Sequence, residues 1–346
     1  MSIPLKKKKN VFIPFYQLYC FLSKMNVYLP GLSRVAVCGG THGNELSGVY
    51  LVREMLRAET GHDVSMQMVL SNPLATELCR RYVDTDLNRC FTYTALNGPL
   101  PDPAPYEMVR ARELNDMLGP KGSPQAVDLV CDLHNSTSNM GLCLITFSDR
   151  DWISLHIYRH LQSEMPDIPV RYIHLDVPNK DSYSVASVGK HGFALEIGPQ
   201  PHGVVRSNIY SAMKEGLQHI LNWVRLFNSG VVFKGGPVDV FTTVGHVDYP
   251  RDGDTQNITA AIHPQLQDRD FCLLHPGDPL FQTFSGQTVS YKGSQALYPF
   301  FINECAYYEN GIALYLATKR TFTIPTVRVL KENYQDVRFQ SEEEEE

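Results

Sequence analysis

The stretch RVAVCGGTHGNELSGVYLVREMLRA, residues 34–58, carries the clearest structural pattern of the chain. It begins with a short apolar run from Arg34 to Cys38, which is typical of a buried strand. A turn-rich loop from Gly39 to Asn44 follows, and from Glu45 to Ala58 the apolar residues recur at helical spacing. The stretch therefore predicts a strand, a loop and an amphipathic helix in that order.

The same alternation continues to about residue 228. Further apolar runs predict strands at 66–70, 127–133, 142–147 and 193–197, and helical patterns occupy 106–118, 152–164 and 209–227. Continuous apolar strands that alternate with helices are typical of a mostly parallel sheet with helices on both faces. We therefore expect an α/β domain over residues 34–228.

The pattern changes after Asn228-Ser229-Gly230. Short β-branched and aromatic runs, interrupted by Gly, Pro and Asp, follow at 231–233, 238–247, 287–291 and 321–327. They predict a smaller β-rich domain over residues 229–340. The acidic residues 341–346 are expected to form a solvated tail.

Residues 1–33 are expected to form a poorly ordered N-terminal extension. A lysine run at 6–9 precedes an apolar stretch at 11–22 that is too short to span a bilayer, so we expect no transmembrane segment.

The amino-acid composition is that of a globular protein and argues against nucleic-acid binding. The chain has 346 residues, of which 43% are hydrophobic and 20% charged, as in ordinary globular proteins. Its 31 Lys and Arg residues against 37 Asp and Glu residues give a net charge of −6, without the basic excess of nucleic-acid-binding proteins. Eight cysteines without a CxxC pair indicate reduced thiols and a cytosolic protein.

Three residues form a candidate metal site. His42 and Glu45 lie three residues apart just after the first strand, and His134 lies at the end of the strand predicted at 127–133. The carboxyl ends of parallel strands meet at one edge of a sheet, where α/β proteins bind ligands. Two histidines and one carboxylate with an open fourth position form the pattern of catalytic zinc. The alternatives are an ordinary strand-to-helix turn and a hydrogen-bonded structural histidine.

Two further features carry possible chemistry. Glu196 interrupts an apolar strand, where burial raises a carboxyl pKa and suits it to act as a general base. The segment Arg80 to Arg89 concentrates cations and amides that can clamp a carboxylate or stabilise an oxyanion. The structural alternative for Glu196 is a buried carboxylate with a structural partner. The alternative for residues 80–89 is a solvated loop with surface ion pairs.

Together, eight motifs resemble the aspartoacylase family, and most closely its aminoacylase-3 branch. They are GGTHGNE (39–45), RRYVDTDLNR (80–89), DLHNSTSNMG (132–141), LEIGPQPHG (195–203), VDYPRD (247–252), HPQLQDRDF (263–271), LHPGDP (274–279) and YPFFINECAYYE (298–309). The resemblance spans about residues 34–323. The resemblance implies a fold related to that of the zinc carboxypeptidases. It also implies that the protein is cytoplasmic and forms homo-oligomers, and that members of this branch associate peripherally with the apical membrane.

The resemblance also implies roles for single residues. One zinc ion per subunit would be held by His42, Glu45 and His134, with Glu196 as general base and acid. Arg81 would polarise the scissile carbonyl. Asn88 and Arg89 would bind the substrate α-carboxylate, and Tyr183 and Tyr307 would line the pocket.

The expected substrates are small N-acyl amino acids. Aspartoacylases place an arginine ten residues before the catalytic glutamate, where this chain has Ala186. Without that cation an acidic substrate side chain loses its partner. The sequence therefore favours hydrolysis of N-acetyl aromatic amino acids and N-acetyl-S-aryl-cysteine conjugates (mercapturic acids). Alternatives are an aspartoacylase acting on N-acetyl-aspartate, a carboxypeptidase and a non-catalytic zinc scaffold.

Overall fold

The computed structural model describes residues 25–57 and 64–330. The lysine run, the apolar stretch 11–22, Ala58 and the acidic tail therefore lie outside the described residues. Within them, nine strands form one sheet in the order β12-β13-β8-β6-β5-β7-β4-β2-β3. These strands are β2 (Arg34–Gly39), β3 (Ser65–Leu70), β4 (Leu129–Asn135), β5 (Gly141–Thr146), β6 (Val170–His174), β7 (His191–Gly198), β8 (Gly236–Asp248), β12 (Tyr298–Phe300) and β13 (Ile312–Ile324).

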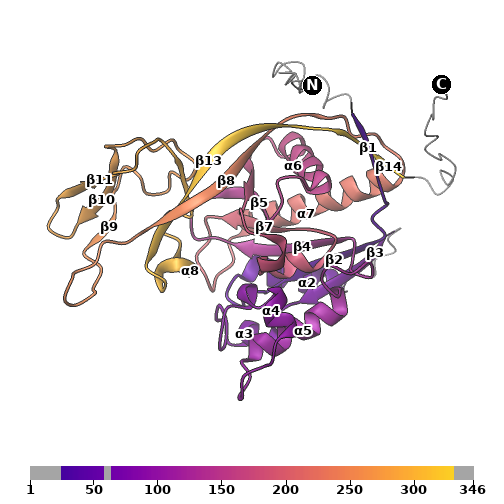
Figure 1. Cartoon of the computed structure of the whole chain (residues 1–346), viewed down its shortest axis with the longest axis horizontal. Coiled ribbons are helices and arrows are strands. Elements are labelled where there is room, and N and C mark those ends of the chain that lie inside the picture. The colour runs from indigo at the N-terminus through magenta and orange to yellow at the C-terminus, as the bar shows by residue number, and fades with distance from the viewer. Residues whose placement is uncertain (1–24, 58–63, 331–346) are drawn as a thin grey trace, which may run out of the picture.

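Helices cover both faces of this sheet, as the sequence predicts (Figure 1). On one face lie α2 (Leu46–Arg57), α6 (Trp152–Glu164) and α7 (Ser207–Asn228), whose apolar sides join one core cluster with the strands. On the other lie α4 (Tyr93–Asn97) and α5 (Tyr106–Leu118), around a second cluster. The short helix α3 (Pro73–Glu77) follows β3. None of the helices in the described residues is long and apolar enough to cross a bilayer.

The sheet contains two sets of parallel strands that run in opposite directions: one set is β3, β2, β4 and β7, and the other is β5, β6 and β8. β4 and β5 lie on either side of β7, with β4 parallel and β5 antiparallel to it. The connection between β4 and β5 is the short turn 136–140, whereas a parallel return needs a crossover of a dozen or more residues. The short turn therefore forces β5 to run back.

The β-rich part of the chain is not separate from the main sheet. β8 pairs with β6 in parallel and with β13 in antiparallel register, so the sheet continues past residue 228. The long paired strands β8 and β13 extend to a lobe formed by the residues between them. This lobe contains a three-stranded sheet made of β9 (Ala260–Ile262), β10 (Pro279–Thr283) and β11 (Thr288–Ser290) (Figure 1). The boundary between residues 228 and 229 stays a prediction.

Two expectations are wrong within the described residues: that residues 25–33 are poorly ordered, and that residues 231–233 form a strand. Within the extension expected over residues 1–33, β1 (Asn26–Leu29) pairs in parallel with β14 (Thr326–Val329), because Val27 and Leu29 pack against the main core. Leu32 is also buried there. Residues 231–233 form no strand, and Phe233 makes only an isolated bridge to Val327.

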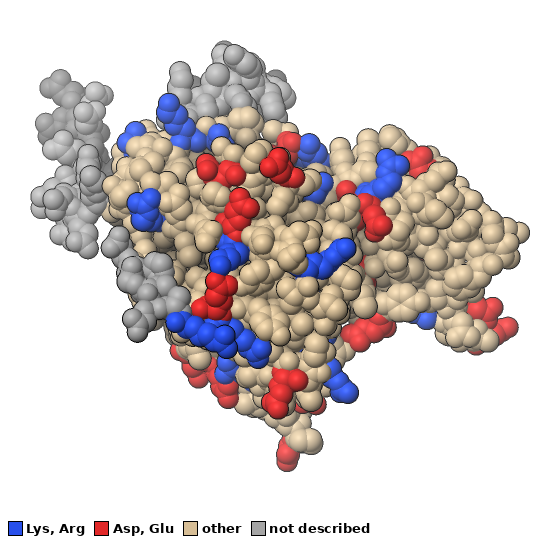
Figure 2. Space-filling view, turned by 180° about the vertical axis from the view of Figure 1, so that it is seen from behind, with Lys and Arg blue, Asp and Glu red and all other residues tan. Residues whose placement is uncertain are grey.

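Charges of both signs are interspersed over the face opposite that of Figure 1, and much of the β-rich lobe on that side is uncharged (Figure 2).

Candidate functional site

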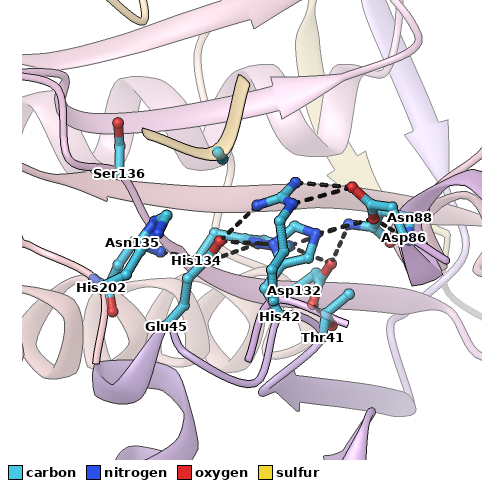
Figure 3. A network of polar contacts seen from close by, with 12 residues as sticks. Thr41, His42, Glu45, Asp86, Asn88, Asp132, His134, Asn135, Ser136 and His202 are labelled. Carbon is cyan, nitrogen blue, oxygen red and sulfur yellow. Dashed lines mark hydrogen bonds and ion pairs between the residues drawn. The ribbon is translucent and has the colours of Figure 1, made fainter. Parts of the chain in front are cut away.

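His42, Glu45 and His134 converge at the carboxyl ends of the parallel strands β2 and β4. His42 and Glu45 lie between β2 and α2, and His134 lies in β4, which pairs directly with β2. The Nδ1 atom of His42 is 2.7 Å from Glu45 Oε1, and His134 Nδ1 is 2.9 Å from Glu45 Oε2. The two Nδ1 atoms are 3.1 Å apart. Three buried side chains thus direct their ligand atoms to one point (Figure 3).

The chemistry of this set fits a metal ion. The Nε2 atom of His134 lies 2.5 Å from Asp132 Oδ2, and that of His42 lies 3.1 Å from Asp86 Oδ1. A carboxylate that accepts the Nε2 proton leaves the Nδ1 lone pair free for coordination, and metal-bound histidines commonly have such a partner. The three residues can therefore hold a divalent cation through two nitrogens and one carboxylate.

Glycine is required in the loop that carries His42. A Cβ atom at Gly43 would lie 2.1 Å from the carbonyl carbon of Ala75, in α3. Any side chain would push the loop away from α3 and displace His42 from the cluster.

Arg81 lies next to the metal-binding set. Its Nη1 donates to Glu45 Oε1 at 3.2 Å, and its Nε and Nη2 donate to Asp86 Oδ2 at 3.2 and 2.9 Å. Burial lowers the pKa of Arg81, but the negative charges of Asp86 and Glu45 have a larger effect in the opposite direction. The net result is a raised pKa, so Arg81 stays charged. Asp86 therefore fixes both His42 and Arg81, a role that the sequence analysis missed.

Asn88, Arg89 and Tyr183 form an adjoining wall. Asn88 Nδ2 donates to Asp132 Oδ2 at 3.2 Å, and Asn88 Oδ1 accepts from the backbone N–H of Val185 at 3.0 Å. The Arg89 guanidinium lies 4.6 Å from the centre of the Tyr183 ring. Two segments distant in sequence, 86–91 and 182–185, are thereby joined.

Glu196 lies in β7 directly opposite His134 in the parallel register. Burial, reinforced by the negative charge of Glu45, raises the pKa of Glu196 well above its ordinary value. A carboxyl group in this environment is suited to exchange a proton near neutral pH.

A cavity joins these groups. All the predicted site residues line it except Glu45, which lies behind His42 and His134. Seven further apolar and aromatic lining residues were missed by the sequence analysis: Ile145, Phe147, Leu175, Ala194, Phe300, Phe301 and Tyr315. Phe300 and Phe301 lie in the motif YPFFINECAYYE, which was a signal that could have identified them. The other five lie in strands or loops without a distinguishing local pattern.

Tyr307 reaches the cavity from the short helix α8 (Cys305–Tyr308). Glu304 caps this helix, because its Oε1 accepts from the backbone N–H of Ala306 at 3.1 Å. Its Oε2 accepts from Thr137 N–H at 2.8 Å and from the Ser136 hydroxyl, both in the turn after β4. Glu304 thus ties Tyr307 to the strand that carries His134.

Ala186 does not line this cavity. It is 4% exposed and belongs to the core cluster that also contains residues of α5, whereas Tyr183 and Ser184 lie on the cavity wall. A substitution by arginine there would disturb packing as well as charge, so Ala186 is a poor probe of substrate choice.

Comparison with known proteins gives a consistent result. Residues 32–224 match the family model of the succinylglutamate desuccinylase/aspartoacylase catalytic domain, and residues 236–319 match the AstE/AspA barrel-sandwich hybrid domain. The chain is 57% identical over 312 residues to N-acyl-aromatic-L-amino acid amidohydrolase (carboxylate-forming) B of Danio rerio, covering 89% of this chain and 99% of the relative.

Two further comparisons cover both branches of the family. The crystal structure of murine aminoacylase 3 superimposes with a TM-score of 0.84 at 44% identity, covering 87% of this chain and 99% of that one. Identity to the aspartoacylase of Danio rerio is lower, 42% over 298 residues, covering 85% of this chain and 94% of the relative.

Proposed function

Because the chain belongs to the succinylglutamate desuccinylase/aspartoacylase family, we propose that it is a zinc-dependent aminoacylase. It would hydrolyse the amide bond of N-acyl, mainly N-acetyl, aromatic L-amino acids and of N-acetyl-S-aryl-cysteine conjugates. The products would be a carboxylate and a free amino acid.

The composition of the cavity is the observation that carries this proposal. One part presents Arg81, Asn88 and Arg89 beside the metal-binding residues, and the rest is predominantly aromatic and aliphatic. The cationic part suits the α-carboxylate of an amino acid, because arginine binds carboxylates through paired hydrogen bonds. The aromatic part suits an uncharged ring and offers an acidic side chain little compensation for its lost hydration.

His42, Glu45 and His134 would hold one zinc ion per subunit. When bound, zinc would supply a Lewis acid that polarises the acyl carbonyl and activates water. The carboxylates of Asp132 and Asp86 would keep the two imidazoles in the required tautomer and orientation.

Glu196 would move the proton in the reaction. Its raised pKa allows it to accept a proton from the attacking water and then to deliver that proton to the leaving amine nitrogen. This transfer makes the amine a good leaving group when the carbon–nitrogen bond breaks. Burial supports the role, because a solvent-exposed glutamate would be too weak a base.

Arg81 would stabilise the negative charge that develops on the acyl oxygen. Its orientation is set in advance by Asp86 and Glu45, so little reorganisation accompanies the reaction. Asn88 and Arg89 would hold the α-carboxylate, and Tyr183 and Tyr307 would contact the substrate from opposite parts of the chain.

Initial deacetylation rates would test the proposal. Zinc-loaded protein is assayed with N-acetyl-tyrosine, an N-acetyl-S-aryl-cysteine and N-acetyl-aspartate, and Glu196→Gln serves as the inactive control. Preference for the two aromatic substrates supports the proposed function. Preference for N-acetyl-aspartate would make the protein an aspartoacylase, and zinc binding without turnover would favour a scaffold. Homo-oligomer formation and a cytoplasmic or apical-membrane location stay predictions.

A further inference from the structure

Lys121 makes an unusual set of contacts close to the cavity. Its Nζ donates to the backbone carbonyl of Phe91 at 2.8 Å, to the carbonyl of Ser182 at 2.6 Å and to the Ser182 hydroxyl at 2.7 Å. A protonated ammonium has three N–H groups, so all of its donors are used. Phe91 and Ser182 are buried.

These acceptors belong to the two segments that form the cavity wall. Phe91 follows Arg89 by two residues, and Ser182 immediately precedes Tyr183. The segments also bond to each other, because Phe91 N–H donates to the Tyr183 carbonyl at 3.3 Å and Val185 N–H donates to the Asn88 side chain. Lys121 therefore binds the back of a wall whose front carries Arg89 and Tyr183.

Lys121 is itself held by a third part of the chain. Its backbone N–H donates to Asn115 Oδ1, in α5, at 2.9 Å. Lys121 lines a surface hollow together with Ser182 and is not part of the cavity lining. It can thus act on substrate only through the two wall segments.

We propose that Lys121 is a positioning residue that fixes Arg89 relative to Tyr183 and so sets the affinity for the carboxylate end of the substrate. The proposal rests on the proposed function. Without the ammonium, two buried carbonyls lose a donor, and the segments 86–91 and 182–185 are free to shift relative to α5.

The protonation state of Lys121 matters to this role. Burial lowers the pKa of Lys121 to about 8. The negative charge of Asp181 acts in the opposite direction and offsets only part of this shift. A neutral amine has two N–H groups and cannot serve all three acceptors. The positioning should therefore weaken as the pH rises through about 8.

Steady-state kinetics on the zinc-loaded full chain would test the proposal, with N-acetyl-phenylalanine as substrate because its side chain does not titrate. Lys121→Met keeps an unbranched side chain only one atom shorter and removes the N–H donors. We expect KM to rise by about tenfold and kcat to change by less than about threefold, because binding is affected and the chemistry is not. Lys121→Arg retains a charge that does not titrate, so its KM should stay flat between pH 7 and 9.5 where that of the unmodified chain rises.

Lys190→Met is the matched control. Lys190 also donates from its Nζ to a buried residue, in its case the carboxylate of Asp128 at 2.8 Å. This bond involves neither wall segment, so the KM of Lys190→Met should be unchanged. Equal KM values for Lys121→Met and the unmodified chain would overturn the proposal, as would an alkaline rise in KM that persists in Lys121→Arg. If the unmodified chain turns over no N-acetyl aromatic substrate, the proposed function fails instead.

Discussion

Replacing Asp132 by asparagine should weaken zinc binding without unfolding the protein. Asp132 is fully buried, and its Oδ2 faces both His134 Nε2 at 2.5 Å and Asn88 Nδ2 at 3.2 Å. Its Oδ1 accepts from the Thr41 hydroxyl at 2.6 Å. An asparagine can turn its carbonyl toward His134 and its amide toward Thr41, so the hydrogen bonds persist but the charge is lost.

The magnitude follows from that change. Loss of a carboxylate partner behind a metal-bound histidine typically lowers metal affinity about 10- to 100-fold. This corresponds to about 1.4 to 2.7 kcal/mol of binding free energy. Because the asparagine keeps the bonding geometry, we expect a value near the lower end, about tenfold.

Competition with a chelator of known zinc affinity measures this effect. The control is Asp128→Asn, just before the same strand, where the carboxylate accepts from the backbone N–H groups of Ser33 and Arg34 and from Lys190. This control should lower the melting temperature and leave zinc affinity unchanged. Zinc affinity within about twofold of the unmodified chain in Asp132→Asn would refute the reasoning.

Three further predictions address proton transfer, the second lobe and pH. Glu196→Gln should lower kcat by about 10²- to 10⁴-fold while zinc affinity in the chelator assay stays unchanged, and a residual rate above that range would contradict a general-base role. Glu304→Gln should destabilise the fold by about 1–3 kcal/mol in denaturant unfolding and raise KM through Tyr307; an unchanged KM would show that this link is dispensable. Burial raises the pKa of Asp270 from 3.8 to about 7, so the folded chain holds a proton that the unfolded chain releases between about pH 4 and 7. The free energy of unfolding should therefore fall as the pH rises through this window, and Asp270→Asn should remove that fall; parallel curves for the two proteins would disprove it.

The sequence predicted those features that depend on local pattern. The bounds of α5 and α6 agree with the predicted ranges, because the apolar periodicity of a helix is written within a few turns. His42, Glu45 and His134 could be grouped because each follows or ends a predicted strand, and parallel strands bring their carboxyl ends together. The short β6 and the antiparallel direction of β5 were missed, since pairing partners are not encoded next to the strands that they join.

Local sequence was sufficient to predict the α/β class, the family and the candidate metal-binding residues, because these features are encoded in short motifs and in periodicity. Three features could be seen only once the chain was folded. Asp86 fixes both His42 and Arg81, and Lys121 joins the segments behind Arg89 and Tyr183. Ala186 lies away from the cavity. Each of these features depends on whether two segments that are distant in sequence come into contact when the chain folds. Such distances are set by how the core packs, and no spacing along the chain specifies them.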